Sequence, residues 1–315
     1  MRFWFHRSER CAVIVGNDSG DQDESRISPE VCCISLERQD DVRSLDAIPT
    51  RVRYESAACV PASGNEVYVT GVGADRKETW KWQPGGGWTR CAGMIQGRRR
   101  HCATFVNQSM YVLGGMIGRP EEEEERILDS IEEYNTETNS WTTVGRLKYP
   151  ICYATCVVHN NSIYVFGGRH QLDKKCLSSV QVFDTVSRET AELRERLPRC
   201  MQMLRSVKRG RFVVIIGKWN CVLFDLEKRK FQQRDQFAAK VHQFGLALEN
   251  ERVFLVGGHA KMRDARGGVT RPVTDDVKSV ALADILDNKD ANWTRHATLP
   301  QPAFIHAFAV MTLPK

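Results

Sequence analysis

The sequence lacks the features that mark membrane-spanning and secreted proteins. In its 315 residues, no apolar run approaches the roughly 18 residues that a membrane-spanning helix needs. The first ten residues contain no continuous apolar stretch, so they do not resemble a secretory signal. The 11 cysteines are scattered through apolar segments rather than set in a compact framework, which is typical of reduced, buried thiols. These absences predict a cytoplasmic protein that has no membrane partner and no intramolecular disulfide.

Enzyme signatures are also missing. The eight histidines form no H-x-x-x-H or H-x-H pair that could hold a metal ion. The sequence contains no G-x-S-x-G elbow, no P-loop and no dinucleotide-binding glycine pattern. Cys152 and Cys156 fall on one side of a predicted strand, but no second pair accompanies them, so we interpret them as core thiols. The sequence therefore predicts no catalytic residue, no metal site and no cofactor.

The charge of the chain is close to balanced. Lys and Arg number 45 and Asp and Glu 39, a net charge of +6, which does not favour nucleic acid as a partner. The densest basic run is 98–101 (RRRH), directly before a predicted strand. Because side chains alternate along a strand, this run predicts a single anion-facing rim residue rather than a continuous patch. The opposite run, Glu121 to Glu125, predicts an extended, solvated loop, since five like charges repel each other.

What the sequence does contain is an internal repeat. An apolar strand that ends in glycine recurs six times, about 48 residues apart on average. A variable stretch and a second β-rich run follow each of these strands, and in three units Trp follows that run (Trp88, Trp141, Trp293). The glycines that end the six strands are Gly16, Gly71, Gly114, Gly167, Gly217 and Gly257. Each unit predicts a small antiparallel sheet with two faces to bury, and six such sheets bury both faces by stacking radially.

The order of apolar strand, Gly-Gly, variable loop, Tyr and Trp resembles the kelch repeat. The spacing from Tyr134 to Trp141 and from Trp82 to Trp88 matches that pattern. No Trp-Asp dipeptide is present, which separates the chain from WD40 repeats of similar period. We therefore expect an all-β, six-bladed kelch β-propeller over residues 10–315, preceded by a short extension at 1–9.

The repeat leaves one strand without a partner at each end of the chain. The first unit begins at Cys11 with its glycine strand and has no preceding inner strand. The segment 302–314 resembles that missing strand and has no glycine strand after it. We expect it to close the ring by completing blade one. This arrangement resembles the propeller of BTB-kelch proteins separated from the BTB and BACK domains that precede it in that family.

The resemblance also implies where a partner would bind. In kelch propellers the residue 14 positions before the blade glycine points into the mouth of the ring and is often Arg. Counting back gives the mouth positions Arg100, Tyr153, Met203 and Gln243, and Tyr54 is assigned to the corresponding place in blade two, which carries an insertion. The closing strand offers Ile305 or His306. The loops after the glycines add Arg119, Arg169, His170, Lys218, Trp219, His259 and Lys261.

These residues predict a protein-binding face, because Arg and aromatic side chains are favoured interface anchors. The expected ligand is an acidic peptide or loop of another protein. The resemblance implies a substrate adaptor of a cullin-type ubiquitin ligase, with cullin as a partner only if a BTB domain lies upstream. Two alternatives stay open: an actin-binding kelch protein, and a kelch-type oxidase that uses Tyr, His and Cys from different blades.

Overall fold

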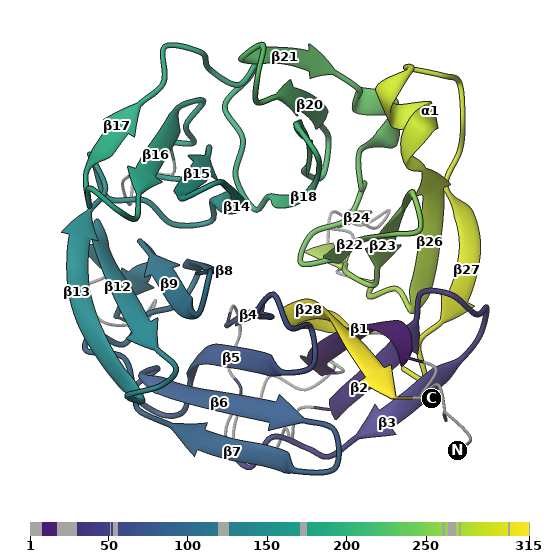
Figure 1. Ribbon diagram of the computed structural model, residues 1–315. Helices are drawn as coiled ribbons and strands as arrows, with labels where there is room; N and C mark the ends of the chain where they lie inside the picture. Colours follow the sequence, from purple (N-terminus) through teal and green to yellow (C-terminus); the bar gives the residue numbers. More distant parts are fainter. Residues whose placement is uncertain are drawn as a thin grey trace, which may run out of the picture.

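The fold is a ring of six four-stranded antiparallel sheets around a central channel (Figure 1). The computed structural model describes residues 8–17, 30–50, 52, 56–118, 126–170, 175–259, 262–263, 269–270, 272–301 and 303–314. This architecture confirms the predicted six-bladed propeller. Within the described ranges, no helical segment reaches the length and hydropathy that a bilayer-spanning helix needs.

Each blade is a sheet whose innermost strand lines the channel. Blade one comprises β28 (Phe304–Pro314), β1 (Ser8–Asn17), β2 (Glu30–Ser35) and β3 (Val42–Leu45). Blade two comprises β4 (Ala57–Cys59), β5 (Val67–Val72), β6 (Glu78–Gln83) and β7 (Gly87–Cys91). Blade three comprises β8 (Cys102–Val106), β9 (Ser109–Leu113), β12 (Ser130–Asn135) and β13 (Ser140–Arg146).

The other three blades repeat this order. Blade four comprises β14 (Thr155–His159), β15 (Ser162–Phe166), β16 (Val180–Asp184) and β17 (Thr190–Glu192). Blade five comprises β18 (Arg205–Arg209), β19 (Phe212–Ile216), β20 (Cys221–Asp225) and β21 (Lys230–Gln233). Blade six comprises β22 (Gly245–Glu249), β23 (Arg252–Val256), β26 (Asp276–Ala281) and β27 (Thr294–Thr298).

Short elements complete the chain between these strands. Two ribbons, β10–β11 (Met116–Ile117 with Arg126–Ile127) and β24–β25 (Met262–Arg263 with Val269–Thr270), extend the loops after the glycines of blades three and six. The 3-10 turn η1 (Asp235–Phe237) follows blade five, and α1 (Leu282–Leu286) joins β26 to β27.

The C-terminal strand closes the ring, as the sequence predicts. Strand β28 pairs antiparallel with β1, with Cys11 opposite Met311 and Val13 opposite Ala309. The two ends of the chain therefore form one sheet, and blade one gains its inner strand from the C-terminus. Strand β1 begins at Ser8, two residues before the predicted domain boundary, and Glu9 within it is fully buried.

The glycines allow close approach between neighbouring blades. Gly114 and Gly167 have φ of +62° and +60°, a region that favours glycine. A Cβ atom on Gly167 would lie 2.5 Å from the carbonyl oxygen of Met201, in the segment that enters blade five. The equivalent Cβ on Gly114 would overlap the carbonyl oxygen of Ile151, at the entry to blade four. A larger residue at either position would push two blades apart.

Aromatic residues pack the blades against each other. The Tyr68 and Tyr134 rings of blades two and three lie 6.1 Å apart, and the Tyr111 and Phe183 rings of blades three and four 6.2 Å. The core is therefore a set of apolar layers between blades rather than a single centre. The outer strands add a recurring hydrogen bond to the previous blade: Trp88 Nε1 to Asp46 O at 2.7 Å, Trp141 Nε1 to Ala92 O at 2.9 Å and Thr190 Oγ1 to Arg146 O at 2.7 Å.

The two ends of the channel carry different strand ends and turns. At one end of the channel, each inner strand begins and each glycine strand ends; we call this end the mouth face. The opposite end carries the tight turns that join the inner strands to the glycine strands and β20 to β21; we call it the turn face. Strand β1 begins and β28 ends on the turn face.

Candidate functional site: the mouth of the propeller

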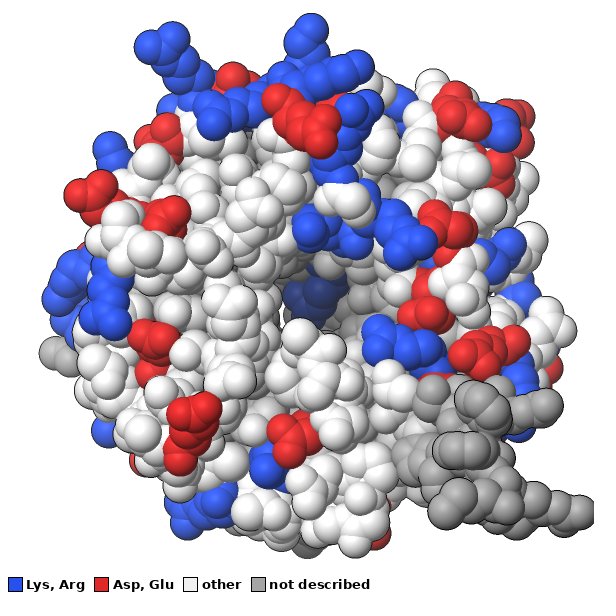
Figure 2. Space-filling model, viewed as in Figure 1, with Lys and Arg blue, Asp and Glu red and all other residues white. Residues whose placement is uncertain are grey.

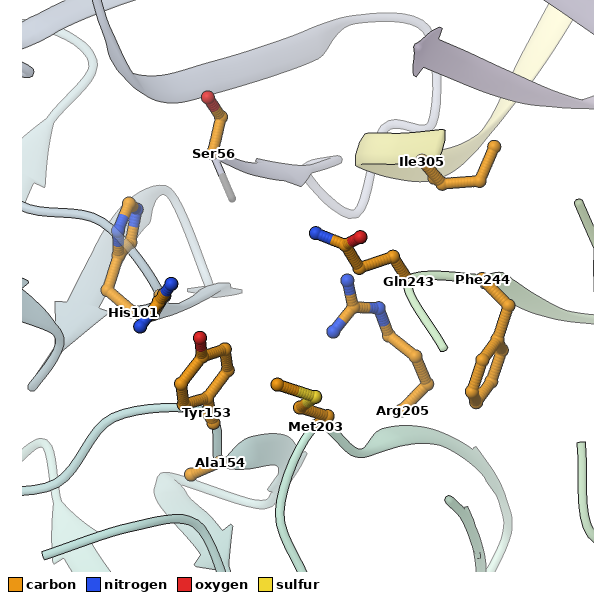
Figure 3. Close-up of a pocket in the computed structure, with 10 residues that line it drawn as sticks. Ser56, His101, Tyr153, Ala154, Met203, Arg205, Gln243, Phe244 and Ile305 are labelled. Carbon is orange, nitrogen blue, oxygen red and sulfur yellow. The ribbon is translucent and has the colours of Figure 1, made fainter. Parts of the chain in front are cut away.

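Four predicted mouth residues occupy equivalent positions and share one backbone conformation. Arg100, Tyr153, Met203 and Gln243 each lie two residues before an inner strand and have φ values of 57°, 59°, 57° and 51°. A non-glycine residue in this left-handed region costs about 1–3 kcal/mol, so the surrounding structure must hold it there. All four residues line a single pocket at the mouth (Figure 3).

A set of backbone hydrogen bonds between blades holds this ring. Tyr153 N donates to Arg100 O at 3.0 Å, and Met203 N donates to Tyr153 O at 2.9 Å. On the other side of the channel, Ile305 N donates to Gln243 O at 3.1 Å. The residue at each position is thus fixed by its neighbour in the next blade, and its side chain is presented to the channel on a rigid support.

The basic run places Arg100 and the largely buried His101 at the mouth pocket. Arg98 and Arg99 are buried and are not among the residues that line it. Arg98 is ion-paired with Glu132 and also donates to Gly114 O at 2.8 Å and Ser130 O at 3.0 Å. The run therefore forms no continuous basic patch, and the anion-facing role of Arg100 stays a prediction.

The Tyr153 ring packs against the guanidinium groups of two arginines. The guanidinium carbon of Arg100 lies 4.2 Å from the centre of the Tyr153 ring, and that of Arg169 lies 5.5 Å from it. Each distance is within the range of a cation–π interaction. The aromatic face therefore orients Arg100 and Arg169, which come from blades three and four.

Arg205 is a pocket residue that the sequence analysis missed. It is the first residue of the inner strand β18, two positions after Met203. Figure 3 shows its guanidinium group pointing into the channel beside Gln243, and it lines both the mouth pocket and the deeper channel. The signal that could have identified it is a basic residue at the start of an inner strand, two positions after a mouth residue.

His101 lines the pocket but does not add charge to it. Its Nε2 is 2.8 Å from Thr70 Oγ1, and its side chain is buried. Burial, helped by the nearby Arg98 charge, lowers the pKa of His101 to about 3. The imidazole is therefore neutral at physiological pH, and the positive charge of the pocket comes from arginine.

The other predicted loop residues that the structure describes lie on the rim and differ in their contacts and exposure. The His170 ring packs 5.5 Å from that of Tyr149, and its Nδ1 lies 2.9 Å from Pro150 O. Lys218 Nζ lies 4.7 Å from the ring of Trp219, which is 67% exposed. His259 is buried, with its ring 5.6 Å from that of His242, so it offers little surface.

Several predicted residues lie outside the described residues. They are Tyr54, Arg119, Lys261 and the acidic run Glu121 to Glu125. The side chain of His306 is also outside the described part of the structure, whereas Ile305 lines the pocket.

One prediction about the cysteines is wrong. Cys176 and Cys200 form a disulfide, with Cα atoms 5.3 Å apart, between the loop after the glycines of blade four and the segment that enters blade five. The two residues are 24 positions apart, and no spacing pattern in the sequence pairs them. The other nine cysteines are free, in line with the prediction for thiols. Across the described ranges, no three His, Cys, Asp or Glu side chains converge as they would to hold a metal ion.

Comparison with known families agrees with this geometry. The KLHDC2/KLHL20/DRC7 Kelch-repeats domain model matches residues 8–196 and 78–258. The chain belongs to this kelch-repeat family. The glycine strands, the outer-strand tryptophans and the left-handed mouth positions are thus the repeated parts of a kelch propeller.

Individual relatives match only part of their own length. The chain is 25% identical to Kelch-like protein 35 of Mus musculus over 232 residues, which is 73% of this chain and 38% of that protein. It is 25% identical to Kelch repeat and BTB domain-containing protein 12 of Danio rerio over 199 residues, 56% of this chain and 31% of that protein. The solved structure of YjhT superposes with a TM-score of 0.67 at 17% identity, covering 82% of this chain and 88% of that one. That likeness concerns the fold alone.

Proposed function

We propose that the propeller is a protein-recognition module whose mouth binds an acidic segment of a partner protein. The observation that carries this proposal is the composition of the mouth pocket. Arg100 and Arg205 line it together with Tyr153 and Gln243, and no Asp or Glu is among the described residues that line it. Arginine binds a carboxylate through two parallel N–H donors, so two such groups give orientation as well as attraction.

The rim supplies a second kind of anchor. Trp219 is one of only three large apolar side chains among the described residues that are exposed, and it lies on the mouth face beside Lys218. Tryptophan is enriched at binding hot spots because it buries a large area with few rotatable bonds. The preferred ligand therefore combines carboxylates for the pocket with an apolar residue for the rim.

The test compares binding by variants that retain the fold. Peptide arrays of Asp/Glu-rich sequences, each paired with its Asn/Gln counterpart, serve as the probe. Arg100→Ala and Arg205→Ala should each weaken binding by about 2 kcal/mol, as truncation of a central anchor does. Arg146→Ala, exposed on the outer strand of blade three, is the matched control. Unchanged binding by the Arg100→Ala, Arg205→Ala double variant, with an unchanged melting temperature, would overturn the proposal.

Within this proposal, the propeller is the substrate-binding part of a BTB-kelch adaptor of a cullin-type ubiquitin ligase. The support comes from the family match and from relatives such as the Danio rerio protein, whose name includes a BTB domain. Cullin binding would then require a BTB domain on the same polypeptide. The upstream coding sequence is the direct test, since a reading frame without a BTB domain would contradict the adaptor role. F-actin cosedimentation tests the actin-binding alternative.

We further propose that the protein binds rather than catalyses, and that it works in the cytoplasm. Besides the Ser56 hydroxyl and the His101 imidazole, the pocket is lined by guanidinium, phenol, thioether and amide groups, which suit recognition. The nine free cysteines support a reducing compartment, whereas the Cys176–Cys200 disulfide is the one feature typical of an oxidising compartment. Imaging of the tagged full-length protein tests the location; accumulation in the secretory pathway would overturn it.

A further inference from the structure

The turn face carries a basic surface that two separate segments of the sequence form together. Two turns of blade five lie side by side there: the β18–β19 turn with Lys208, Arg209 and Arg211, and the β20–β21 turn with Lys228, Arg229 and Lys230. Five of these six side chains are exposed, and Arg211 is half-buried. We call these six residues the blade-five basic surface. Figure 2 shows blue side chains gathered over β20 and β21 at the top of this face.

Hydrogen bonds and ion pairs hold the two turns together. Leu226 N donates to Arg211 O at 2.9 Å, which joins one turn to the other. Arg211 also lies 3.0 Å from Glu227 and 3.4 Å from Asp225. The Asp225 carboxylate accepts the backbone N–H groups of Glu227 and Lys228, each at 3.0 Å, and so shapes the second turn. The surface is therefore supported by ordered backbone.

Two of the six cations already have partners. Arg211 pairs with Asp225 and Glu227, and Arg209 pairs with Glu251 of blade six. Among the described residues, no ion pair joins Lys208, Lys228, Arg229 or Lys230 to a carboxylate. Four cations on adjacent turn tips are thus available to an external anion.

The repeat supplies an internal comparison. In blade three, the turns equivalent to these two are 107–108 (NQ) and 136–139 (TETN), and they carry no cation. The same turn shape therefore forms without Lys or Arg. The fold does not require the basic residues of blade five, and their concentration on one blade calls for a role in binding.

We propose that the blade-five basic surface binds a short acidic segment of a partner protein, at the end of the propeller opposite the mouth. The small number of available cations favours an acidic peptide over nucleic acid. A protein that binds nucleic acid commonly contacts about 6–10 phosphates, more than four cations on two turns can serve. A lipid surface favours clusters without carboxylates, whereas Glu227 and Glu251 lie within this one. Three or four carboxylates on a peptide match the available charges, and this site is independent of the mouth.

The test uses a fluorescein-labelled Glu-rich peptide of about ten residues, with its Gln-rich counterpart as the uncharged probe. To separate the two sites, all binding is measured in the Arg100→Ala, Arg205→Ala background. Replacing Lys228, Arg229 and Lys230 by Gln should weaken binding of the Glu-rich peptide about tenfold, because several exposed charge contacts are lost together. The matched control replaces Arg90, Arg146 and Lys289 by Gln, which removes the same charge from exposed positions of blades two, three and six.

Lysine labelling gives a second readout, which locates the bound peptide on the surface. The Glu-rich peptide should protect Lys228 and Lys230 from an amine-reactive reagent and leave Lys218, on the mouth face, unprotected in this background. Equal weakening by both triple variants, or no protection of Lys228 and Lys230, would overturn the proposal. Tighter binding of a single-stranded RNA or of phosphatidylserine vesicles than of the peptide would also overturn it, in favour of that other partner.

Discussion

Arg98 and Glu132 form an ion pair in which the side chains are 0% and 1% exposed. Glu132 also accepts the backbone N–H groups of Ile95 at 2.8 Å and Gln96 at 3.1 Å. The pair therefore ties the segment that leaves blade two to the third strand of blade three. A cation that the linear sequence places in a basic run acts here as a structural clamp between blades.

This burial predicts a large cost when one charge is removed. Glu132→Gln leaves the Arg98 guanidinium buried without its counter-charge, so we expect unfolding free energy to fall by about 3–5 kcal/mol. Urea denaturation measures the change. Asp129→Asn is the control, because its partner Arg146 is 71% exposed and such pairs contribute about 0–1 kcal/mol. Equal effects of the two substitutions would contradict the structural role.

Two tryptophans, one buried and one exposed, allow the effect of burial on stability to be compared. Trp141 is buried, packs 5.1 Å from the Tyr134 ring and donates to Ala92 O, whereas Trp219 is exposed on the rim. Trp141→Ala should reduce the unfolding free energy by about 3–5 kcal/mol. Trp219→Ala should change it by less than about 0.5 kcal/mol and affect partner binding instead. Thermal melts of the two variants check this, and similar melting temperatures would count against it.

Ring closure predicts sensitivity to truncation at the C-terminus. A chain that ends at Leu299 loses β28, which leaves β1 as an exposed strand edge in blade one. We expect this variant to aggregate or to lose cooperative unfolding in circular dichroism. Removal of Lys315 alone should have no such effect. A soluble, cooperatively folded chain ending at Leu299 would show that β28 is not required to close the ring.

The Cys176–Cys200 disulfide gives a redox-dependent expectation. Mass spectrometry without reductant should find this single bridge and nine free thiols. For two residues 24 positions apart, the bridge should stabilise the fold by about 3 kcal/mol. Cys176→Ser should therefore lower the melting temperature relative to the oxidised wild type, and reductant should remove the difference. A melting temperature of wild type that does not respond to reductant would contradict a stabilising bridge.

His101 predicts a pH dependence of stability. Its pKa in the folded protein is about 3, below the value of about 6.5 in an unfolded chain, so the unfolded state binds the proton more tightly. The contribution of His101 is complete above pH 6.5 and is lost as pH falls toward 3. Between pH 7 and pH 5 this linkage removes about 2 kcal/mol of unfolding free energy. His101→Gln should show a shallower fall over the same range, and parallel curves would contradict the shifted pKa.

The repeat in the sequence determined the fold and most of the mouth positions. Glycine strands at a regular period predict blades because each sheet must bury two faces, and the unpartnered strands at the two ends predict the closure. Counting back from the glycines located Arg100, Tyr153, Met203 and Gln243, since a residue in the same place of each repeat meets the same neighbours. These inferences depend on local spacing, which a sequence records directly.

Only the tertiary structure decided which charged and thiol groups meet. Arg98 pairs with Glu132, which lies 34 positions away, whereas Arg100 lines the pocket. Cys176 is disulfide-bonded because the fold brings Cys200 next to it. The blade-five basic surface forms because the chain returns beside itself, so that Arg211 and Lys228 come to neighbouring turns. Burial and charge pairing are set by residues distant in sequence, and a pattern of residue types cannot specify them until the strands are packed.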